Sequence, residues 1–423
     1  MRVGEISLSG SCLRTSPHRD TVTMQKLLGV VLFAMSAVMT LARAMLNSKR
    51  GGTRLLCMSS APSSSSAKLS VGSTLTNTDL ALEAVKAFYP DASSVKITPT
   101  SGGVNNVVQF LEIPSTGERK ILRIYNNGNN TPRVAFEHAI LSRLAVKSSE
   151  MSFQIPRFIP TLGDKSKTFV QLSTGAAACI VDIIEGGLPK LTCVRDIGRA
   201  SGELNSFISK VELPAELGNG PTPPYFELFK VHHAVTREAF YREMAGKDFD
   251  GVRASADKMV RFITEMETQI ESLKTLKLPF CLIHGDLHYD NVLVKDGRVT
   301  GLLDFEFASR DWRAMELAIC LSKYAGEKDK DGNPVAMPFF EDFIDGFAVS
   351  GELTQQEMEA VPALINLRIL SNVVYFVGRA LGGEDDISSL TTRIANYCGR
   401  VEWINANSQK IVDLIKAKMR AIQ

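Results

Sequence analysis

The chain has 423 residues, of which 44% are hydrophobic and 22% charged, and its formal net charge is +2 from 48 basic and 46 acidic side chains. This length predicts two or three lobes with a sizeable core. The near balance of charge gives no electrostatic footprint for nucleic acid, so we expect no nucleic-acid partner. The seven cysteines form no CxxC pair, which indicates reduced thiols rather than a disulfide framework.

The first seventy residues differ in composition from the rest. No acidic residue occurs between Asp20 and Asp79, and Leu27–Ala42 is an uncharged run of 16 mostly apolar residues. A membrane-spanning helix needs roughly 20 such residues, so a signal sequence fits better than a retained anchor. The Arg- and Ser-rich stretch that follows is typical of a transit peptide. We therefore expect residues 1–70 to be a targeting presequence and linker, and we favour a plastid over a mitochondrion as the destination. We expect no stable membrane association once the presequence has been removed.

Residues 71–185 predict a small antiparallel sheet lobe. Thr78 is the expected N-cap of a first helix that ends near Pro90. Pro132 is expected in the first turn of a second helix, which is embedded between strands. The strand patterns, recognised by alternation and by flanking turn residues, lie at 94–98, 106–113, 120–125, 169–172 and 177–184.

Residues 186–423 predict a larger, mostly helical lobe. Two short strand signals, 292–295 and 299–304, flank the turn Asp296-Gly297. The predicted fold class is α+β, with a small antiparallel sheet lobe carrying one helix and a helical lobe joined to it between Ile184 and Leu188. Helical periodicity occurs at 194–211, 251–274, 316–324, 338–349, 355–381 and 390–422.

One stretch carries most of the chemical information: CLIHGDLHYDNVLVKDGRVTGLLDFE, residues 281–306. It places Asn291 five residues after Asp286, and Asp304 thirteen residues further on. Phosphoryl transfer from a nucleotide needs a carboxylate that orients the attacking hydroxyl, and an amide and a second carboxylate that hold metal ions. Asp286 and Asn291 are therefore the candidate catalytic residues, and Asn291 and Asp304 the candidate Mg²⁺ ligands. Glu306 is either a further metal ligand or a solvated acid at a strand end.

The motifs HGDLHYDNVLV, LLDFEFA and RDWRAMELA resemble those of the aminoglycoside phosphotransferase and choline kinase superfamily, relatives of the protein kinases. The closest resemblance is to the type II homoserine kinase and hydroxylysine kinase branch. It covers roughly residues 95–380 and implies a protein-kinase-like fold, in which a five-stranded lobe and a helical lobe hold ATP between them. One departure is Glu316, where the family often has Asp, so the brace that this acid gives the catalytic loop is in doubt.

In the small lobe, the resemblance implies that Arg123 takes the place of the phosphate-binding Lys of the protein kinases. Glu137, on the following helix, is expected to pair with this cation. Arg133 lies four residues before Glu137 on the same helix and is a competing partner. The Arg at position 123 either grips phosphate oxygens or is a surface arginine of a strand.

Two further nucleotide contacts are implied by the resemblance. The loop containing Gly102 and Gly103 would bring backbone amides to the phosphates, although two glycines before two asparagines are also typical of a simple turn. Ile184, between the lobes, would meet adenine through its backbone N–H and C=O.

The acceptor site is the least determined part. Arg368 and Arg379 share a helical stripe with Tyr375, and they could hold the carboxylate of an amino-acid acceptor or face solvent in ion pairs. An acidic surface for a polycation is offered by Glu384, Asp385 and Asp386 alone. We predict an ATP- and Mg²⁺-dependent kinase of a small-molecule alcohol, best matched by homoserine or a similar hydroxy-amino acid. The alternatives are a choline, ethanolamine or sugar kinase, and a catalytically weak kinase-like binding or scaffold protein.

Overall fold

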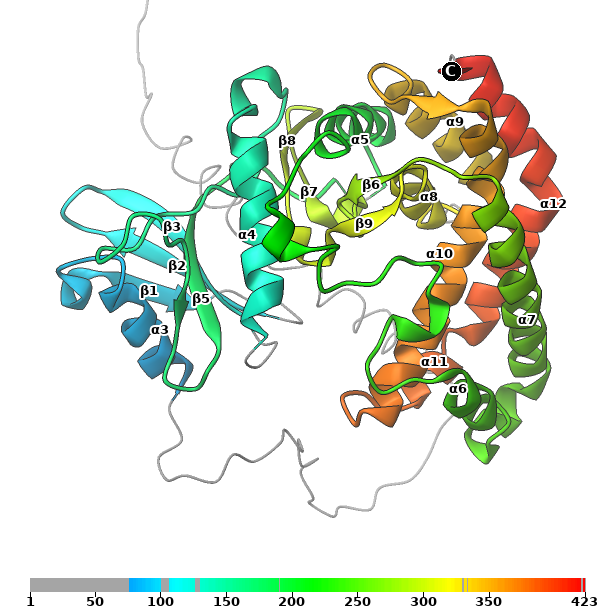
Figure 1. The fold of residues 1–423 in the computed structure, drawn as a ribbon, viewed down its shortest axis with the longest axis horizontal. Helices are drawn as coiled ribbons and strands as arrows, with labels where there is room; N and C mark the ends of the chain where they lie inside the picture. Colours follow the sequence, from blue (N-terminus) through cyan, green and yellow to red (C-terminus); the bar gives the residue numbers. More distant parts are fainter. Residues whose placement is uncertain are drawn as a thin grey trace, which may run out of the picture.

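The computed structural model describes residues 76–99, 106–125, 130–189, 191–328, 331–332, 334–419 and 421–422. The predictions for residues 1–70 and for Gly102 and Gly103 fall outside these residues. Figure 1 shows the sheet and helix α3 at one side of the molecule, helix α4 in the middle, and the remaining helices at the other side.

The small part is one antiparallel sheet of five strands. It contains β1 (Lys96–Pro99), β2 (Asn106–Ile113), β3 (Glu118–Tyr125), β4 (Val170–Gln171) and β5 (Ala177–Asp182), in the order β1-β2-β3-β5-β4. Strand β3 lies at the centre, and its register places Arg123 opposite Val108 on one side and Cys179 on the other. This central position holds the backbone of Arg123 between two hydrogen-bonded neighbours.

Two helices cover the sheet. Helix α3 (Asn77–Lys86) begins with a capping box between Thr76 and Asp79, so the N-cap is Thr76 rather than the predicted Thr78. Its buried face packs on one side of the sheet. On the other side lies α4 (Thr131–Ala145), which is capped by Asn130. Val134 of α4 belongs to a cluster with buried residues of the sheet, and Phe136, Ile140, Leu141 and Leu144 belong to the helical core, so this helix joins the two parts of the protein.

The helical part is built from α5 (Val194–Ile208), α6 (Arg237–Met244), α7 (Arg253–Thr275), α8 (Met315–Ser322), α9 (Ala336–Phe347), α10 (Gln355–Leu381), α11 (Ser388–Thr391) and α12 (Ile394–Lys418). Three two-stranded sheets accompany the helices. They pair β6 (Phe280–Ile283) with β9 (Ser309–Trp312), β7 (Val292–Lys295) with β8 (Arg298–Leu302), and β10 (Leu353–Thr354) with β11 (Ala421–Ile422).

Helix α10 is the centre of the helical core. Within the described residues, it is the one helix long and apolar enough to cross a membrane, and 72% of its most apolar window is buried inside the protein. A helix that is apolar on most sides is expected where neighbours surround it. Its neighbours here are α7, α8 and α12.

Four features of the helical part differ from the sequence prediction. The pairing of β6 with β9 and the short helix α6 were not predicted. The pattern at 390–422 forms two helices, α11 and α12, rather than one. Strand β8 ends at Leu302 instead of Asp304, and Asp304 adopts a left-handed backbone with φ of 64°. Such a backbone is costly for a non-glycine residue, and it takes this carboxylate out of the strand.

Candidate active site between the sheet and the helical part

The catalytic loop follows β6 and is held from two directions. Gly285 has φ of 81°, and a Cβ there would lie 2.3 Å from the carbonyl oxygen of Phe307, so only glycine fits this close approach. The ring of His284 donates from Nε2 to the carbonyl of Leu303 (2.9 Å) and accepts at Nδ1 from the backbone N–H of Asp286 (3.3 Å). The Glu316 carboxylate accepts from the backbone N–H of His284 at 2.6 Å. The longer acid at position 316 therefore still braces the loop.

Asp286 lies in this loop and has three polar neighbours. Asn291 donates to its backbone carbonyl at 2.8 Å, Arg368 donates to its Oδ1 at 2.6 Å, and His288 Nε2 lies 3.5 Å from its Oδ2. Burial raises the pKa of Asp286, but His288, Arg368 and Lys323 outweigh burial and hold the pKa well below its usual range. Asp286 is therefore an ionised carboxylate throughout the neutral range.

Asp304 and Glu306 form a carboxylate pair beside this loop. The backbone N–H of Leu303 donates to the carbonyl of Asn291 at 2.9 Å, and this contact brings the residue after Leu303 next to the catalytic loop. Burial and the neighbouring Glu306 carboxylate raise the pKa of Asp304. Two neighbouring carboxylates repel each other when both are charged, and a bound cation relieves this repulsion. Because Asn291 donates through Nδ2, its Oδ1 remains as a third oxygen ligand.

Arg123 reaches this pair from the sheet. Its guanidinium lies 2.8 Å from Glu137, 3.2 Å from Asp304 and 2.9 Å from Glu306. The competing partner, Arg133, instead donates to the backbone carbonyl of Glu306 at 3.1 Å and stacks over Phe307. Arg123 is therefore a buried cation at the boundary between the sheet and the helical part, and not a surface arginine.

The segment that leaves β5 runs past the helical part at Ile184. Its side chain packs against Gly301 of β8, where a Cβ would lie 2.5 Å from Ile184 Cγ2. Among the described residues, none makes a hydrogen bond to the backbone N–H or C=O of Ile184. Both groups are therefore available to the edge of a base. On the sheet, Asn106 donates to Glu306 at 3.0 Å, which places the start of β2 over the carboxylate pair.

The two arginines predicted for the acceptor site have different surroundings. Arg368 contacts Asp286, and its side chain is 11% exposed, so the alternative of a solvent-facing arginine is wrong for this residue. Arg379 lies two turns further along α10 from Asn372 and is paired with Asp385 and Glu384. These pairs compensate the acidic run at 384–386 and leave Arg379 outside the group around Asp286.

Two residues near Asp286 were missed in the sequence. Tyr225 belongs to a stretch with loop composition, but its hydroxyl donates to the carbonyl of Gly285 at 2.6 Å and its ring lies under Arg368 at 5.2 Å. Lys323 follows the last residue of α8 and interacts electrostatically with Asp286. Neither residue belongs to a motif, and the tertiary fold alone brings them to the catalytic loop.

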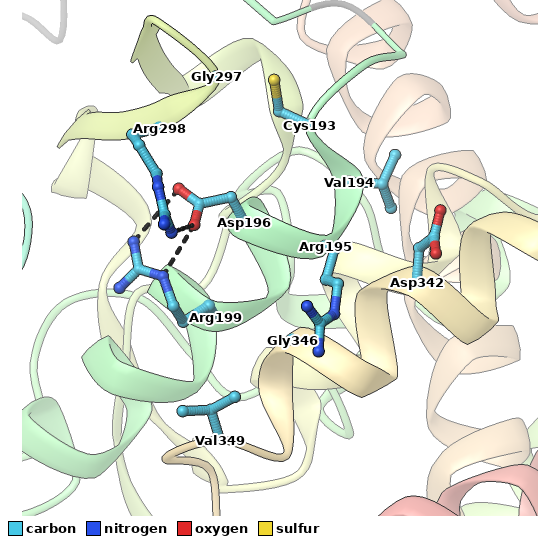
Figure 2. Close-up of a pocket in the computed structure, with 10 residues that line it drawn as sticks. All are labelled: Cys193, Val194, Arg195, Asp196, Arg199, Gly297, Arg298, Asp342, Gly346 and Val349. Carbon is cyan, nitrogen blue, oxygen red and sulfur yellow. Dashed lines mark hydrogen bonds and ion pairs between the residues drawn. The ribbon is translucent and has the colours of Figure 1, made fainter. Parts of the chain in front are cut away.

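A separate polar cavity of about 480 Å³ lies at the start of α5 (Figure 2). The carboxylate of Asp196 lies there between Arg298 and Arg199, at 3.1 and 2.8 Å. It also accepts from the backbone N–H of Val299 at 2.6 Å, which fixes β8 to α5. The residues that line this cavity do not include those of the catalytic loop, so it is not part of the candidate active site.

Comparison with known proteins identifies the family. The model of the phosphotransferase enzyme family matches residues 96–353, which include the catalytic loop, Asp304 and Arg123. The chain belongs to this family. The predicted relationship to the aminoglycoside phosphotransferase and choline kinase superfamily is confirmed. The protein is thus a small-molecule kinase, a phosphotransferase with an alcohol group as acceptor.

Individual relatives support the assignment to the phosphotransferase enzyme family. The chain is 39% identical over 281 residues to a homoserine kinase of Sinorhizobium medicae (strain WSM419), covering 66% of this chain and 77% of that protein. It is 27% identical over 281 residues to a homoserine kinase of Rhizobium meliloti (strain 1021), with the same coverage.

Solved structures of similar fold agree. A microcompartment-associated aminopropanol kinase superposes with a TM-score of 0.60 at 16% identity, covering 79% of this chain and 99% of that chain. An aminoglycoside phosphotransferase from Alicyclobacillus acidocaldarius gives a TM-score of 0.53 at 14% identity, covering 82% and 98%. The predicted two-lobed fold is confirmed.

Proposed function

We propose that the protein transfers the γ-phosphoryl group of ATP, with Mg²⁺, to the hydroxyl of a hydroxy-amino acid such as homoserine. The observation that carries this proposal is the arrangement around Arg123. This cation of the sheet contacts Asp304 and Glu306 of the helical part, and the backbone of Leu303, next to Asp304, is bonded to Asn291, which in turn donates to Asp286. A phosphate-binding cation, metal-binding oxygens and an orienting carboxylate are the parts that phosphoryl transfer requires.

The donor set fits magnesium. Asp304, Glu306 and Asn291 offer oxygen ligands, which Mg²⁺ prefers, and two side chains suffice because the ion keeps waters and takes phosphate oxygens. When bound, Mg²⁺ neutralises charge on the transferred phosphoryl group. Asn291 also holds the backbone of Asp286 at 2.8 Å, so one side chain would fix both the metal and the catalytic loop.

The nucleotide would bind between the sheet and the helical part. Arg123 would face the phosphates, and Glu137, which is 3% exposed, holds the guanidinium at 2.8 Å. The free backbone groups of Ile184 would contact adenine. Amicoumacin kinase hAmiN, a protein with a TM-score of 0.52 to this chain at 15% identity, has been solved in complex with AMP-PNP and Ca²⁺. Its ligands are consistent with ATP and a divalent cation here.

Asp286 would orient the acceptor hydroxyl and take its proton. The transition state of phosphoryl transfer is loose, so the proton leaves late and the base need not be strong. A carboxylate with a low pKa meets this requirement. Arg368 and Asn291 fix its position, with one contact to the side chain and one to the backbone.

The relatives in sequence favour homoserine as acceptor, because the proteins that are 39% and 27% identical to this chain are homoserine kinases. The cations near Asp286 agree, since Arg368 and Lys323 suit an acceptor with a carboxylate. The same cations disfavour choline or ethanolamine, whose single charge is positive.

The test is the Asp286→Asn variant, which keeps the shape of the side chain and removes its charge. We expect phosphoryl transfer to homoserine to fall by about 10²–10⁴-fold, because a positioned base contributes that much, while ATP still binds. Transfer is measured with labelled ATP, and binding by calorimetry. The control is Asp342→Asn, at the exposed Asp342 beside the cavity of Figure 2, which should keep full activity.

The outcomes separate the alternatives. Normal turnover in Asp286→Asn would rule out the role given to this carboxylate. A wild-type protein that binds ATP and Mg²⁺ but phosphorylates none of homoserine, choline, ethanolamine and simple sugars would favour the binding or scaffold alternative.

A further inference from the structure

The peptide group between Gly285 and Asp286 is held at both ends. The Tyr225 hydroxyl donates to the carbonyl of Gly285 at 2.6 Å, and the N–H of Asp286 donates to Nδ1 of His284 at 3.3 Å. Gly285 has a φ of 81°, and the backbone of a residue without a Cβ has more conformational freedom than any other. The two hydrogen bonds therefore fix the plane of the peptide from which the side chain of Asp286 projects.

Tyr225 also supports the side chain of Asp286. The central carbon of the Arg368 guanidinium lies 5.2 Å from the centre of the Tyr225 ring, and the same guanidinium donates to Oδ1 of Asp286 at 2.6 Å. A cation over an aromatic face is attracted to it, and more strongly where both groups are shielded from water. The side chain of Arg368 is 11% exposed, so it is largely shielded. Tyr225 thus reaches the catalytic carboxylate through the backbone and through a side chain.

The position of Tyr225 is itself fixed. Its backbone N–H donates to Oδ2 of Asp311 at 2.6 Å, and the other oxygen of this carboxylate accepts from the N–H of Trp312 at 2.7 Å. Asp311 is fully buried on β9, which pairs with β6, the strand directly before the catalytic loop. Burial raises the pKa of the Tyr225 hydroxyl, so this group keeps its proton and is a donor at neutral pH. Tyr225 is therefore anchored to the same strand pair as the loop that it contacts.

We propose that Tyr225 is a positioning residue for phosphoryl transfer, and that it aligns Asp286 through the Gly285 carbonyl and through Arg368. The inference rests on the proposed function, because it takes Asp286 as the residue that orients the acceptor hydroxyl. Alignment matters because a displacement of about 1 Å can cost about 10²-fold in rate. A residue outside the catalytic motif thereby sets the geometry of the carboxylate at its centre.

Two substitutions in the full-length protein separate the two routes. Tyr225→Phe keeps the ring and removes the hydroxyl, so we expect kcat to fall by about 2- to 12-fold, as for loss of one neutral hydrogen bond. Tyr225→Leu removes the ring as well and should lower kcat by a further factor of about 2 to 30. KM for ATP should stay within about twofold in both variants. Rates are measured with homoserine, or with whichever acceptor of the panel the wild type phosphorylates.

Arg368→Met tests the side-chain route. Because the ring acts on Asp286 through this guanidinium, the difference in kcat between Tyr225→Phe and Tyr225→Leu should disappear when each is combined with Arg368→Met. A further factor that persists in the combined variants would overturn this route.

Tyr241 supplies the matched control. Its hydroxyl donates to Glu267 at 2.6 Å, and Arg237 lies over its ring at 4.9 Å, so it makes the same two kinds of contact between α6 and α7. Neither helix contributes a residue to the candidate active site. Tyr241→Phe and Tyr241→Leu should therefore keep the kcat of the wild type, and thermal unfolding checks the fold of every variant.

The remaining outcomes separate this inference from the proposed function. Unchanged kcat in Tyr225→Phe and Tyr225→Leu, with activity lost in Asp286→Asn, would overturn the role of Tyr225 alone, and a lower unfolding temperature would then mark a purely structural residue. A rise in KM for ATP without a fall in kcat would also overturn it. Normal turnover in Asp286→Asn, or a wild type that transfers to no acceptor, would overturn the proposed function and the role of Tyr225 with it.

Discussion

At the scale of single residues, Arg123 connects the carboxylates of the proposed nucleotide site. One guanidinium contacts Glu137, Asp304 and Glu306, and a single lysine ammonium could not reach all three carboxylates with the same geometry. From the sequence, Arg123 was either a phosphate-binding residue or a surface arginine of a strand. In the structure it is the main link between the sheet and the candidate metal-binding acids.

Arg123→Lys should therefore weaken ATP use while the fold is kept. Loss of one charge-assisted hydrogen bond costs about 1.5–3 kcal/mol, so we expect kcat/KM for ATP to fall by about 10- to 150-fold. Steady-state kinetics measures the effect. Arg119→Lys is the matched control, since Arg119 is an exposed arginine on the same strand and the same face of β3. Equal kinetics in both variants would contradict the assigned role.

At the scale of elements, the first turn of α8 holds the catalytic loop in place through Glu316. Glu316 is fully buried and accepts from the backbone N–H of His284 at 2.6 Å, while its Oε1 has no partner among the described residues. Burial raises the pKa of Glu316 to about 7, although the backbone hydrogen bonds oppose this rise. The loop is therefore braced by a carboxyl group whose charge changes near neutral pH.

The pH dependence of stability follows from this pKa. In the unfolded chain Glu316 ionises near the ordinary glutamate pKa of 4.5, so between there and about pH 7 the folded state binds more protons than the unfolded state. Stability from this group is present below pH 4.5 and is lost as pH rises to about 7. Relative to Glu316→Gln, the wild type should lose about 2–3 kcal/mol between about pH 5 and 7.

Urea unfolding of both proteins at about pH 5, 6, 7 and 8 measures this difference. Groups common to both proteins, including His284, cancel in the comparison. A difference that stays constant across this range would show that Glu316 ionises normally in the folded protein.

At the scale of the whole molecule, a buried ion pair joins α10 to the segment after β9. Arg313 forms two hydrogen bonds to Glu357, one of them from Nε at 3.0 Å, and Glu357 is fully buried. Glu357 also completes the capping box of α10 with Thr354. The central helix of the core is thus tied to the β6–β9 strand pair, and the catalytic loop begins directly after β6.

Removal of the arginine should destabilise the whole protein. Arg313→Ala leaves Glu357 buried without its cation, and breaking one partner of a buried pair costs about 3–5 kcal/mol. The control is Lys258→Ala, which breaks the exposed pair with Glu402 and should cost under about 1 kcal/mol. The free energy of unfolding in urea measures both. Similar losses for the two variants would contradict the role given to the buried pair.

The sequence was most informative where the candidate catalytic residues lie close together along the chain. The motif at 281–306 specified Asp286, Asn291 and Asp304, because loop and hairpin residues close in sequence stay close in the fold. Strand 106–113 and helix 355–381 were predicted with their observed bounds, since their apolar patterns are long and regular. The short strands β6 and β9 were missed because four-residue strands have too few positions to show a pattern.

The sequence by itself determined the reaction class, the fold class and the carboxylates of the site. Tertiary structure alone decided which cations serve those carboxylates. It brought Arg123 to Asp304 over 181 positions of the chain, Arg368 to Asp286 over 82, and Arg379 away from both to Asp385. The physical reason is that a long, flexible cationic side chain pairs with whichever acid the packing of other elements brings within reach.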